Sequence, residues 1–399
     1  MFLKLYCDNK SKKYTTRSIN HIKFLPESKM VNVSDAVVVV DTQTNAYGIF
    51  DKNDKLVPES LQYRGKNHQF IPRHVPQDAP YIDTDVIWVG RIYPHFGHFM
   101  VEHLNRLWGD NEKSHKTKYL FINNLGMDVQ NFVYDFMAAY GVKPDDIIIL
   151  NNSARFRTVY IPCQTLNISS AWISNKMSIG YRAMARNING AGYDKVYMSR
   201  TKLPPGMRTI GEEKIQQIFE KNGYKIIYPE TMTIAEQIAA VRDAKFLAGC
   251  AGTALHWALF MKPGGTVISL KRNSKQDNFA QTQYMFNTVS GLNSVFVWAS
   301  KETHKSKHSS SYAPQIIGVT KYVKLFFDDF GFEYNDSDIA PDTESMHEYL
   351  TQYEKYKSEH GGNWYESFCR HAIKITSCLV PGRINRNRYR QWCKKQLHL

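Results

Sequence analysis

The chain has 399 residues, a formal charge of +14 at pH 7, and 43% apolar residues. That much apolar surface excludes a disordered chain, and the length predicts two domains of ordinary size. No stretch approaches the roughly 20 uninterrupted apolar residues that a membrane-spanning helix needs, and the 6 cysteines form no C-x-x-C pair. We therefore expect no transmembrane helix, no structural zinc site and no disulfide framework.

The net positive charge and the N-terminal residues indicate where the protein is located and what it binds. Charged residues interrupt the start of the chain before a signal-peptide core can form, so we expect a cytoplasmic protein. The positive balance favours an anionic lipid surface or an anionic sugar donor as partner, or it serves solubility alone. The basic residues are mostly dispersed, without a zinc-finger or RNA-binding signature, so nucleic acid is not an expected partner.

Short apolar runs rich in β-branched residues alternate with helical patterns along most of the chain. Because these runs are continuous rather than alternating, they predict parallel strands that helices cover on both faces. The runs span residues 36–41, 86–89, 119–123, 147–150 and 159–162 in the first half, and 195–199, 224–228, 245–250, 266–270 and 295–299 in the second.

This rhythm predicts two doubly wound α/β domains, at residues 1–170 and 190–300. The strand pattern lapses between them, at 167–189. Residues 301–399 form an extension that we expect to be helical, with a helix over 341–360. From residue 381 the end is basic and aromatic, which favours contact with an anionic membrane surface; a solvated end is the alternative.

Two helices of the second domain have clear ends. Thr233 and Glu236 form the capping-box pattern, which predicts a helix start there. Apolar residues at helical spacing predict another helix over 212–221, which Asn222-Gly223 ends.

The first reactive cluster follows the run at 86–89. On a helix, Phe99, Met100, Val101, Leu104, Leu107 and Trp108 share an apolar arc, and the polar arc holds His98, Glu102, Asn105 and Arg106. A helix that begins after a parallel strand points its first turn into the ligand crevice of an α/β protein. His98 and Glu102, at i and i+4, then suit general-base catalysis. A solvated polar face is the alternative, and His103 is expected to pack in the core.

The second cluster is cationic. The strand at 195–199 ends in Ser199-Arg200, and Lys202 and Arg208 follow. Arginine matches phosphate oxygens in a bidentate manner and lysine adds a point charge, so this loop is a candidate anion site. A basic surface loop is the alternative.

The third cluster is a turn of small residues between the strand at 245–250 and a predicted helix. Gly249, Ala251 and Gly252 let a ligand approach the backbone, and the amides that begin a helix favour an anion. We expect this turn to open on the same sheet edge as Arg200. Two D-x-D patterns, Asp83-Thr84-Asp85 and Asp336-Ser337-Asp338, are attributed to turn chemistry rather than to a cation site.

The order of the three clusters is distinctive. It consists of His98 through Trp108, then Tyr197-Met198-Ser199-Arg200 with Arg208 and Glu212, then Glu236-Gln237-Ile238, and finally Ala251-Gly252-Thr253-Ala254-Leu255 with Phe260. Over roughly residues 85–275 it resembles the family 61 glycosyltransferases, whose bacterial members are described as capsular polysaccharide biosynthesis proteins. The family's usual His-Gly-Ala reads Ala251-Gly252-Thr253 here, and a later asparagine is Trp257; the adjacent His256 is a candidate substitute for either lost polar group.

The resemblance implies a GT-B fold, in which two Rossmann-like domains face a cleft. It also implies transfer with inversion from a nucleotide-sugar donor, without a metal or other cofactor. The donor-binding residues would come from the second domain: Arg200, Lys202, Arg208, Gly252, Thr253 and His256. These cations and the helix start would stabilise the diphosphate leaving group. Glu102 would be the catalytic base, with His98 as its partner or substitute.

We therefore expect a glycosyltransferase that extends a capsule or lipopolysaccharide glycan at the inner face of the cell membrane. The acceptor would be a glycan or glycolipid. Two alternatives stay open, because one fold hosts many functions. They are a non-catalytic protein that binds a glycan or nucleotide, and a nucleotide-sugar epimerase.

Overall fold

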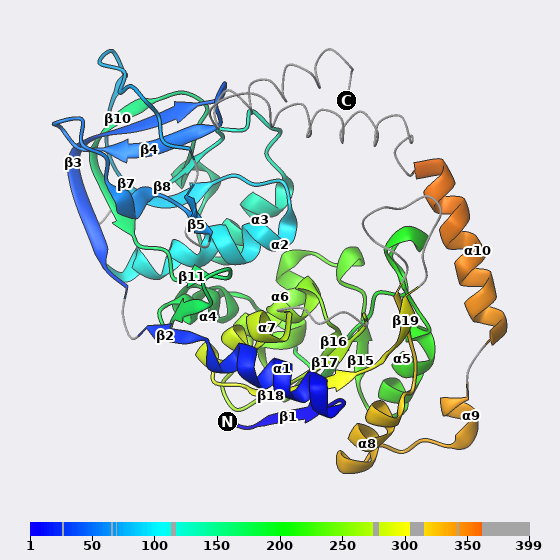
Figure 1. Cartoon of the computed structure of the whole chain (residues 1–399). Helices are drawn as coiled ribbons and strands as arrows, with labels where there is room; N and C mark the ends of the chain where they lie inside the picture. The colour runs from blue at the N-terminus through cyan, green and yellow to red at the C-terminus, as the bar shows by residue number, and fades with distance from the viewer. Residues whose placement is uncertain are drawn as a thin grey trace.

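The computed structural model describes residues 1–25, 28–64, 67–68, 70–112, 117–273, 279–303, 315–340 and 343–360. Within these ranges the chain forms two six-stranded sheets, three smaller sheets and the helices that flank them (Figure 1). The predicted α/β class is confirmed. All ten predicted strand segments lie in strands, with ends that differ by a few residues.

The first six-stranded sheet has the order β4-β3-β10-β7-β8-β9. Its strands are β3 (Met30–Asp41), β4 (Ala46–Phe50), β7 (Tyr81–Arg91), β8 (Lys118–Ile122), β9 (Ile147–Leu150) and β10 (Ala154–Pro162). We call this sheet and the segments packed on it the first lobe. Strands β10, β7, β8 and β9 pair in parallel, as predicted, but β3 is antiparallel to both of its neighbours.

The prediction of an all-parallel first sheet was therefore wrong for β3. The antiparallel pairing of β3 with β4 follows from the connection between them, which is only residues 42–45. A turn this short joins antiparallel strands, whereas a parallel pair needs a crossover of about a dozen residues or more. Asp41 Oδ1 accepts from the amides of Gln43 and Thr44, and Asn45 has a φ of 56°, which is typical of such a turn.

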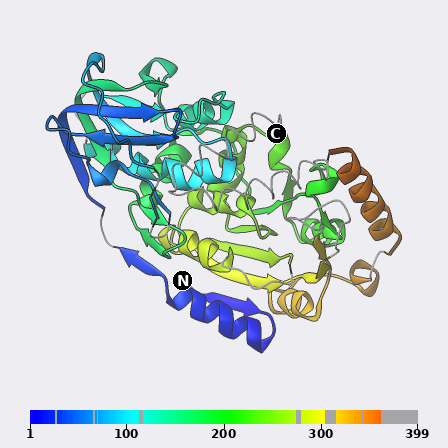
Figure 2. The same cartoon turned by 45° about the horizontal axis from the view of Figure 1, so that its top comes forward.

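The second six-stranded sheet is parallel throughout, in the order β15-β13-β16-β17-β18-β1. Its strands are β13 (Lys195–Met198), β15 (Lys225–Ile227), β16 (Phe246–Cys250), β17 (Thr266–Lys271), β18 (Asn293–Trp298) and β1 (Leu3–Tyr6). With its helices it forms the second lobe (Figure 2). The strand order reverses between β13 and β16, which is the position where open α/β sheets bind ligands.

Strand β1 lies at the edge of the second sheet, although the sequence grouped the first residues with the first domain. Leu3 to Tyr6 pair in register with Ser294 to Val297 of β18. Helix α1 (Asn9–Asn20) follows, with Asp8 accepting from the Ser11 amide at its start. The segment 1–25 thus completes the second lobe before the chain enters the first, because backbone pairing with β18 is a contact that local patterns do not encode.

Helices of the second lobe match the sequence closely. Helix α5 (Glu212–Lys221) ends at Asn222, and Gly223 has the expected positive φ of 80°. Helix α6 (Ile234–Arg242) begins with the predicted capping box between Thr233 and Glu236. No helix within the described ranges combines the length and apolar character needed to cross a bilayer.

The two lobes share one hydrophobic core. It contains Ile87 and Phe121 of the first sheet together with Leu247 and Val267 of the second. Between them lie α3 (Asn131–Ala139), α4 (Met177–Asn187), α6 and the short helix η7 (Thr253–Phe260). Trp257 of η7 stacks on Phe136 of α3, with ring centres 6.2 Å apart. The tryptophan that departs from the family pattern therefore packs where the lobes meet.

The extension after residue 300 packs on the second lobe. It contains β19 (Ser300–Thr303), β20 (Gln315–Ile317), α8 (Lys321–Asp329), α9 (Asp336–Ile339) and α10 (Thr343–His360), and β20 pairs with β14 (Thr209–Ile210). The predicted helix at 341–360 is confirmed over the described residues. The predicted basic membrane contact falls on residues 381–399, which lie outside the described residues.

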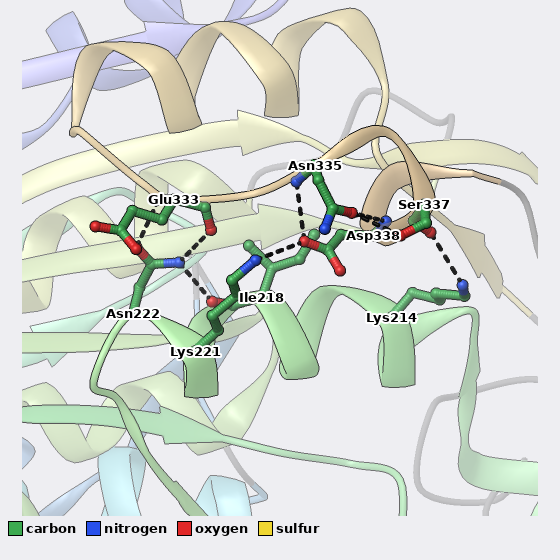
Figure 3. A network of polar contacts seen from close by, with 8 residues as sticks. All are labelled: Lys214, Ile218, Lys221, Asn222, Glu333, Asn335, Ser337 and Asp338. Carbon is green, nitrogen blue, oxygen red and sulfur yellow. Dashed lines mark hydrogen bonds and ion pairs between the residues drawn. The ribbon is translucent and has the colours of Figure 1, made fainter.

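Figure 3 shows how α9 and the segment before it are held against α5. Lys221 Nζ lies 3.1 Å from Asp338 Oδ2, and Lys214 donates to the Ser337 carbonyl. Asn222 exchanges two hydrogen bonds with the backbone of Glu333, at 2.9 and 2.7 Å. These contacts hold the extension on the helix whose first residue, Glu212, supports the candidate site described below.

Candidate active site

The helix predicted after β7 is irregular. It consists of α2 (Phe96–His98), a π-helical turn η2 (Phe99–His103) and a 3₁₀ segment η3 (Leu104–Glu112). A π-turn within a helix is rare and often lies at a functional site. His98 Nδ1 lies 2.9 Å from Glu102 Oε1, so the predicted pair is in contact. The His98 side chain is 30% exposed and that of Glu102 only 12%.

The apolar arc of this segment is buried, as predicted, but half of the polar arc is buried as well. The Arg106 guanidinium donates to the backbone carbonyls of Glu59, Leu61 and Pro162. Asn105 donates to the Glu102 carbonyl at 2.6 Å. The prediction that Asn105 and Arg106 share a reactive face with His98 was therefore wrong. Asn105 bonds to the π-turn and Arg106 anchors the 3₁₀ segment, since buried polar groups require hydrogen-bond partners.

His103 packs in the core, as predicted. Its ring stacks on Tyr93 with centres 5.5 Å apart, and burial lowers the pKa of its imidazole well below the usual value. Tyr93 also contacts the edge of His98. His95, by contrast, is exposed and lies 4.8 Å from the His98 ring centre.

Arg200 follows β13 and Gly252 follows β16, so both lie where the strand order reverses. A Cβ placed on Gly252 would lie 3.9 Å from Arg200 Nη1 and 3.6 Å from Arg272 Nη2. Arg272 directly follows β17, and its Nε donates to the Ala251 carbonyl at 2.8 Å. The sequence analysis missed Arg272, although its position after a predicted parallel strand was a usable signal. Two guanidinium groups therefore surround the glycine, where a phosphate would fit.

The other two predicted cations lie against aromatic rings. Lys202 Nζ lies 3.9 Å from the centre of the Tyr228 ring. Arg208 Nε donates to the Leu203 carbonyl at 2.5 Å, and its guanidinium lies 5.9 Å from the Tyr349 ring of α10. Neither provides any of the three atoms nearest to Gly252, so the loop cations do not all converge as the sequence suggested.

The lobes touch beside these groups. A Cβ placed on Gly97 would lie 2.7 Å from Thr253 Oγ1, so only glycine allows this approach. Because Gly97 precedes His98 and Gly252 precedes Thr253, this contact brings the His98–Glu102 pair near the Arg200–Arg272 pair.

His256 itself is buried in the second lobe. Its Nδ1 lies 3.0 Å from Gln283 Oε1, and burial lowers its pKa to about 4. The ring also lies edge-on to Phe286. His256 is therefore neutral at physiological pH and serves the packing of η7 against α7 (Phe279–Val289). Its predicted part in donor binding stays a prediction.

Glu212 holds the backbone of Arg200 in place. Its carboxyl is fully buried and accepts from the Arg200 amide at 3.1 Å and from the Tyr197 hydroxyl at 3.2 Å. Burial raises the pKa of Glu212 to about 7, against the opposite effect of Arg200. The carboxyl thus joins the end of β13 to the loop that carries Arg200.

Glu212→Gln should change how stability depends on pH. Because the folded protein binds the Glu212 proton more tightly than the unfolded chain, this group favours folding at low pH. That contribution is lost as the pH rises through about 7. From pH 5 to 8 the free energy of unfolding of the wild type should fall relative to the variant, by on the order of 3 kcal/mol at about 1.4 kcal/mol per pKa unit. Urea titrations at several pH values would measure this. The exposed control Glu220→Gln should follow the wild type, and a Glu212→Gln curve parallel to both would contradict the assignment.

The two D-x-D patterns have structural partners. Asp83 and Asp85 lie within β7, not in a turn as expected, and both bond to Arg157. Asp338 caps α9 with Asn335, in agreement with turn chemistry. No group of three or more potential metal ligands occurs in the part of the chain that the structure describes.

A comparison with protein families bears on the reaction class. Residues 96–268 match the family model described as Glycosyltransferase 61. Over these residues the chain is similar to the glycosyltransferase 61 family. The match runs from α2 into β17, so the matched region includes His98, Glu102, Arg200 and Gly252, whereas Arg272 and segment 1–25 lie outside it. The protein is a glycosyltransferase, as predicted. A comparison with curated proteins returned no match.

Proposed function

We propose that the protein is an inverting glycosyltransferase that uses a nucleotide-sugar donor and needs no metal ion. The observation that carries this proposal is the contact of Gly97 with Thr253. It brings a candidate base from the first lobe to an anion-binding turn of the second. Two lobes that share a site in this way fit the GT-B arrangement, and the glycosyltransferase 61 match supports the reaction class.

The pair in the first lobe suits proton removal from an acceptor hydroxyl. With His98 Nδ1 bonded to Glu102, its Nε2 is the nitrogen that can accept a proton. His98 is also the more exposed of the two. We therefore assign His98 as the base and Glu102 as the carboxylate that orients it and stabilises the imidazolium. This reverses the order of roles that the sequence analysis favoured.

The second lobe suits the leaving group. Cleavage of the bond between sugar and diphosphate increases the negative charge on the diphosphate, and fixed cations stabilise that charge. Arg200 and Arg272 lie on two sides of Gly252, whose lack of a side chain leaves the backbone amides accessible. In this proposal these cations perform the task that a divalent metal performs in other transferases.

We further propose that the acceptor is a glycan or glycolipid of a cell-surface polysaccharide, extended at the inner face of the cell membrane. The net charge of +14 supports attraction to an anionic surface or an anionic glycan. The resemblance to capsular polysaccharide proteins supports this acceptor class.

Product analysis tests the proposed reaction. The protein is incubated with a panel of nucleotide sugars and candidate glycan acceptors, with and without EDTA. We expect acceptor-dependent release of a nucleoside diphosphate, unchanged by EDTA, and a glycosidic bond of opposite anomeric configuration to the donor by NMR. Retained configuration would refute inversion, loss of activity with EDTA would refute metal independence, and donor interconversion without acceptor would indicate an epimerase.

A further inference from the structure

A cavity lies at the carboxyl edge of the second sheet, against helix α1. Its walls come from the ends of β1, β17 and β18 and from one face of α1. The segment 1–25 therefore builds part of it, although the family match begins only at residue 96. Residues that line it include Cys7, Tyr14, Thr15, Ser269, Lys271 and Trp298.

This cavity adjoins the anion site. Ala251 and Arg272 both line it. Ala251 directly precedes Gly252, and Arg272 Nη2 lies 3.6 Å from the position of a Cβ placed on Gly252. Arg272 thus reaches Gly252 with its guanidinium while it also lines the cavity. If the diphosphate of a ligand lies at Gly252, the group attached to that diphosphate can extend into this cavity.

The lining suits a nucleoside. Tyr14 and Trp298 offer aromatic surfaces for a planar base, and Leu5, Phe296 and Val297 make the floor apolar. Lys271 Nζ lies 4.8 Å from the centre of the Trp298 ring. Ser269 and Thr15 add hydroxyl groups that can bond to a ribose or to the base edge. Small-molecule sites combine these features: apolar and aromatic walls with a few polar groups.

We propose that this cavity binds the nucleoside half of the sugar donor, and that the segment 1–25 completes the donor site. The inference rests on the proposed function, because it takes the diphosphate to lie at Gly252. It adds that donor recognition depends on residues that pack against the matched region from outside its sequence. The base would then be selected by α1 and the ends of β17 and β18.

Two adjacent threonines of α1 allow a matched test. Thr15 lines the cavity, whereas Thr16 is exposed. Thr15→Trp should fill the space and Thr16→Trp should not. Binding of UDP, GDP, ADP, CDP and inorganic pyrophosphate to the full-length protein is measured by calorimetry. We expect one nucleoside diphosphate to bind the wild type at least tenfold more tightly than pyrophosphate does. Thr15→Trp should remove this preference and leave pyrophosphate affinity unchanged, while Thr16→Trp binds like the wild type.

The outcomes separate the two proposals. A folded Thr15→Trp variant that keeps the wild-type preference would overturn the nucleoside pocket, as would a wild type that binds pyrophosphate as tightly as every nucleoside diphosphate. If Thr15→Trp does not fold, Trp298→Leu provides the same comparison from the opposite wall, with a loss of preference expected. Failure of the transferase proposal appears differently, as nucleoside diphosphate binding without sugar transfer to any acceptor.

Discussion

His98→Asn should lower the rate of sugar transfer by about 10² to 10⁴-fold, the usual contribution of a general base. The acceptor oxygen must lose its proton as it attacks, and asparagine cannot take that proton. Glu102→Gln should lower the rate less, because the amide oxygen can still accept from His98 Nδ1 but no longer stabilises a positive imidazolium. Initial rates of nucleoside diphosphate release over a range of pH would measure both effects.

The two substitutions should also be strongly non-additive. If Glu102 acts through His98, then Glu102→Gln should have little further effect in the His98→Asn background. His95→Asn is the neighbouring control, since His95 is exposed and its ring lies 4.8 Å from that of His98. A loss for His95→Asn as large as for His98→Asn would mean that the base is misassigned. Near-native transfer by both His98→Asn and Glu102→Gln would refute the site.

Arg200→Ala should lower the rate of transfer by about 10² to 10³-fold, as expected when one preorganised donor to a developing negative charge is lost. Arg272→Ala should have an effect of similar size, because both guanidinium groups lie near Gly252. Rates at saturating donor would show this loss at the chemical step. Arg200→Lys should recover part of it, since lysine keeps the charge but not the bidentate geometry.

The activity of Lys202→Ala should be compared with that of Arg200→Ala and Arg272→Ala. The sequence ranked Lys202 with Arg200, but the structure has its ammonium group against Tyr228. We expect only a few-fold change in kcat/KM for Lys202→Ala. Melting temperatures should be measured alongside, because Arg200 lies beside the buried Glu212 and its loss could destabilise that loop. Equal losses for Lys202→Ala and Arg200→Ala would contradict the distinction drawn from the geometry.

Local patterns predicted much of the second lobe. Continuous β-branched runs predicted its parallel strands, and the capping box of Thr233 and Glu236 is present where expected. The pattern failed at β3, which pairs antiparallel with both β4 and the distant β10, and at β1, whose short sequence pairs with a strand almost 300 residues away. Apolar content indicates that a segment is a strand, but pairing partners depend on the rest of the chain.

The sequence also predicted only some features of the candidate site. Spacing alone predicted that His98 contacts Glu102, and strand ends predicted Arg200 and Gly252. The sequence pattern could not distinguish these residues from Asn105 and Arg106, which have equally polar side chains but are buried. Exposure depends on what packs over a side chain, and Arg106 is buried with its guanidinium bonded to the carbonyls of residues 59, 61 and 162.

The sequence by itself determined most of the strands and helices of the two lobes, because these follow from short-range patterns. The reaction class came from the resemblance of three residue clusters, in their order along the chain, to a known family. Only the tertiary structure decided that Gly97 touches Thr253, that Arg272 joins Arg200, and that segment 1–25 forms a wall beside them. These are contacts between residues far apart in the chain. They arise when apolar surfaces of both lobes are buried in one core, and no local preference specifies which side chains then meet.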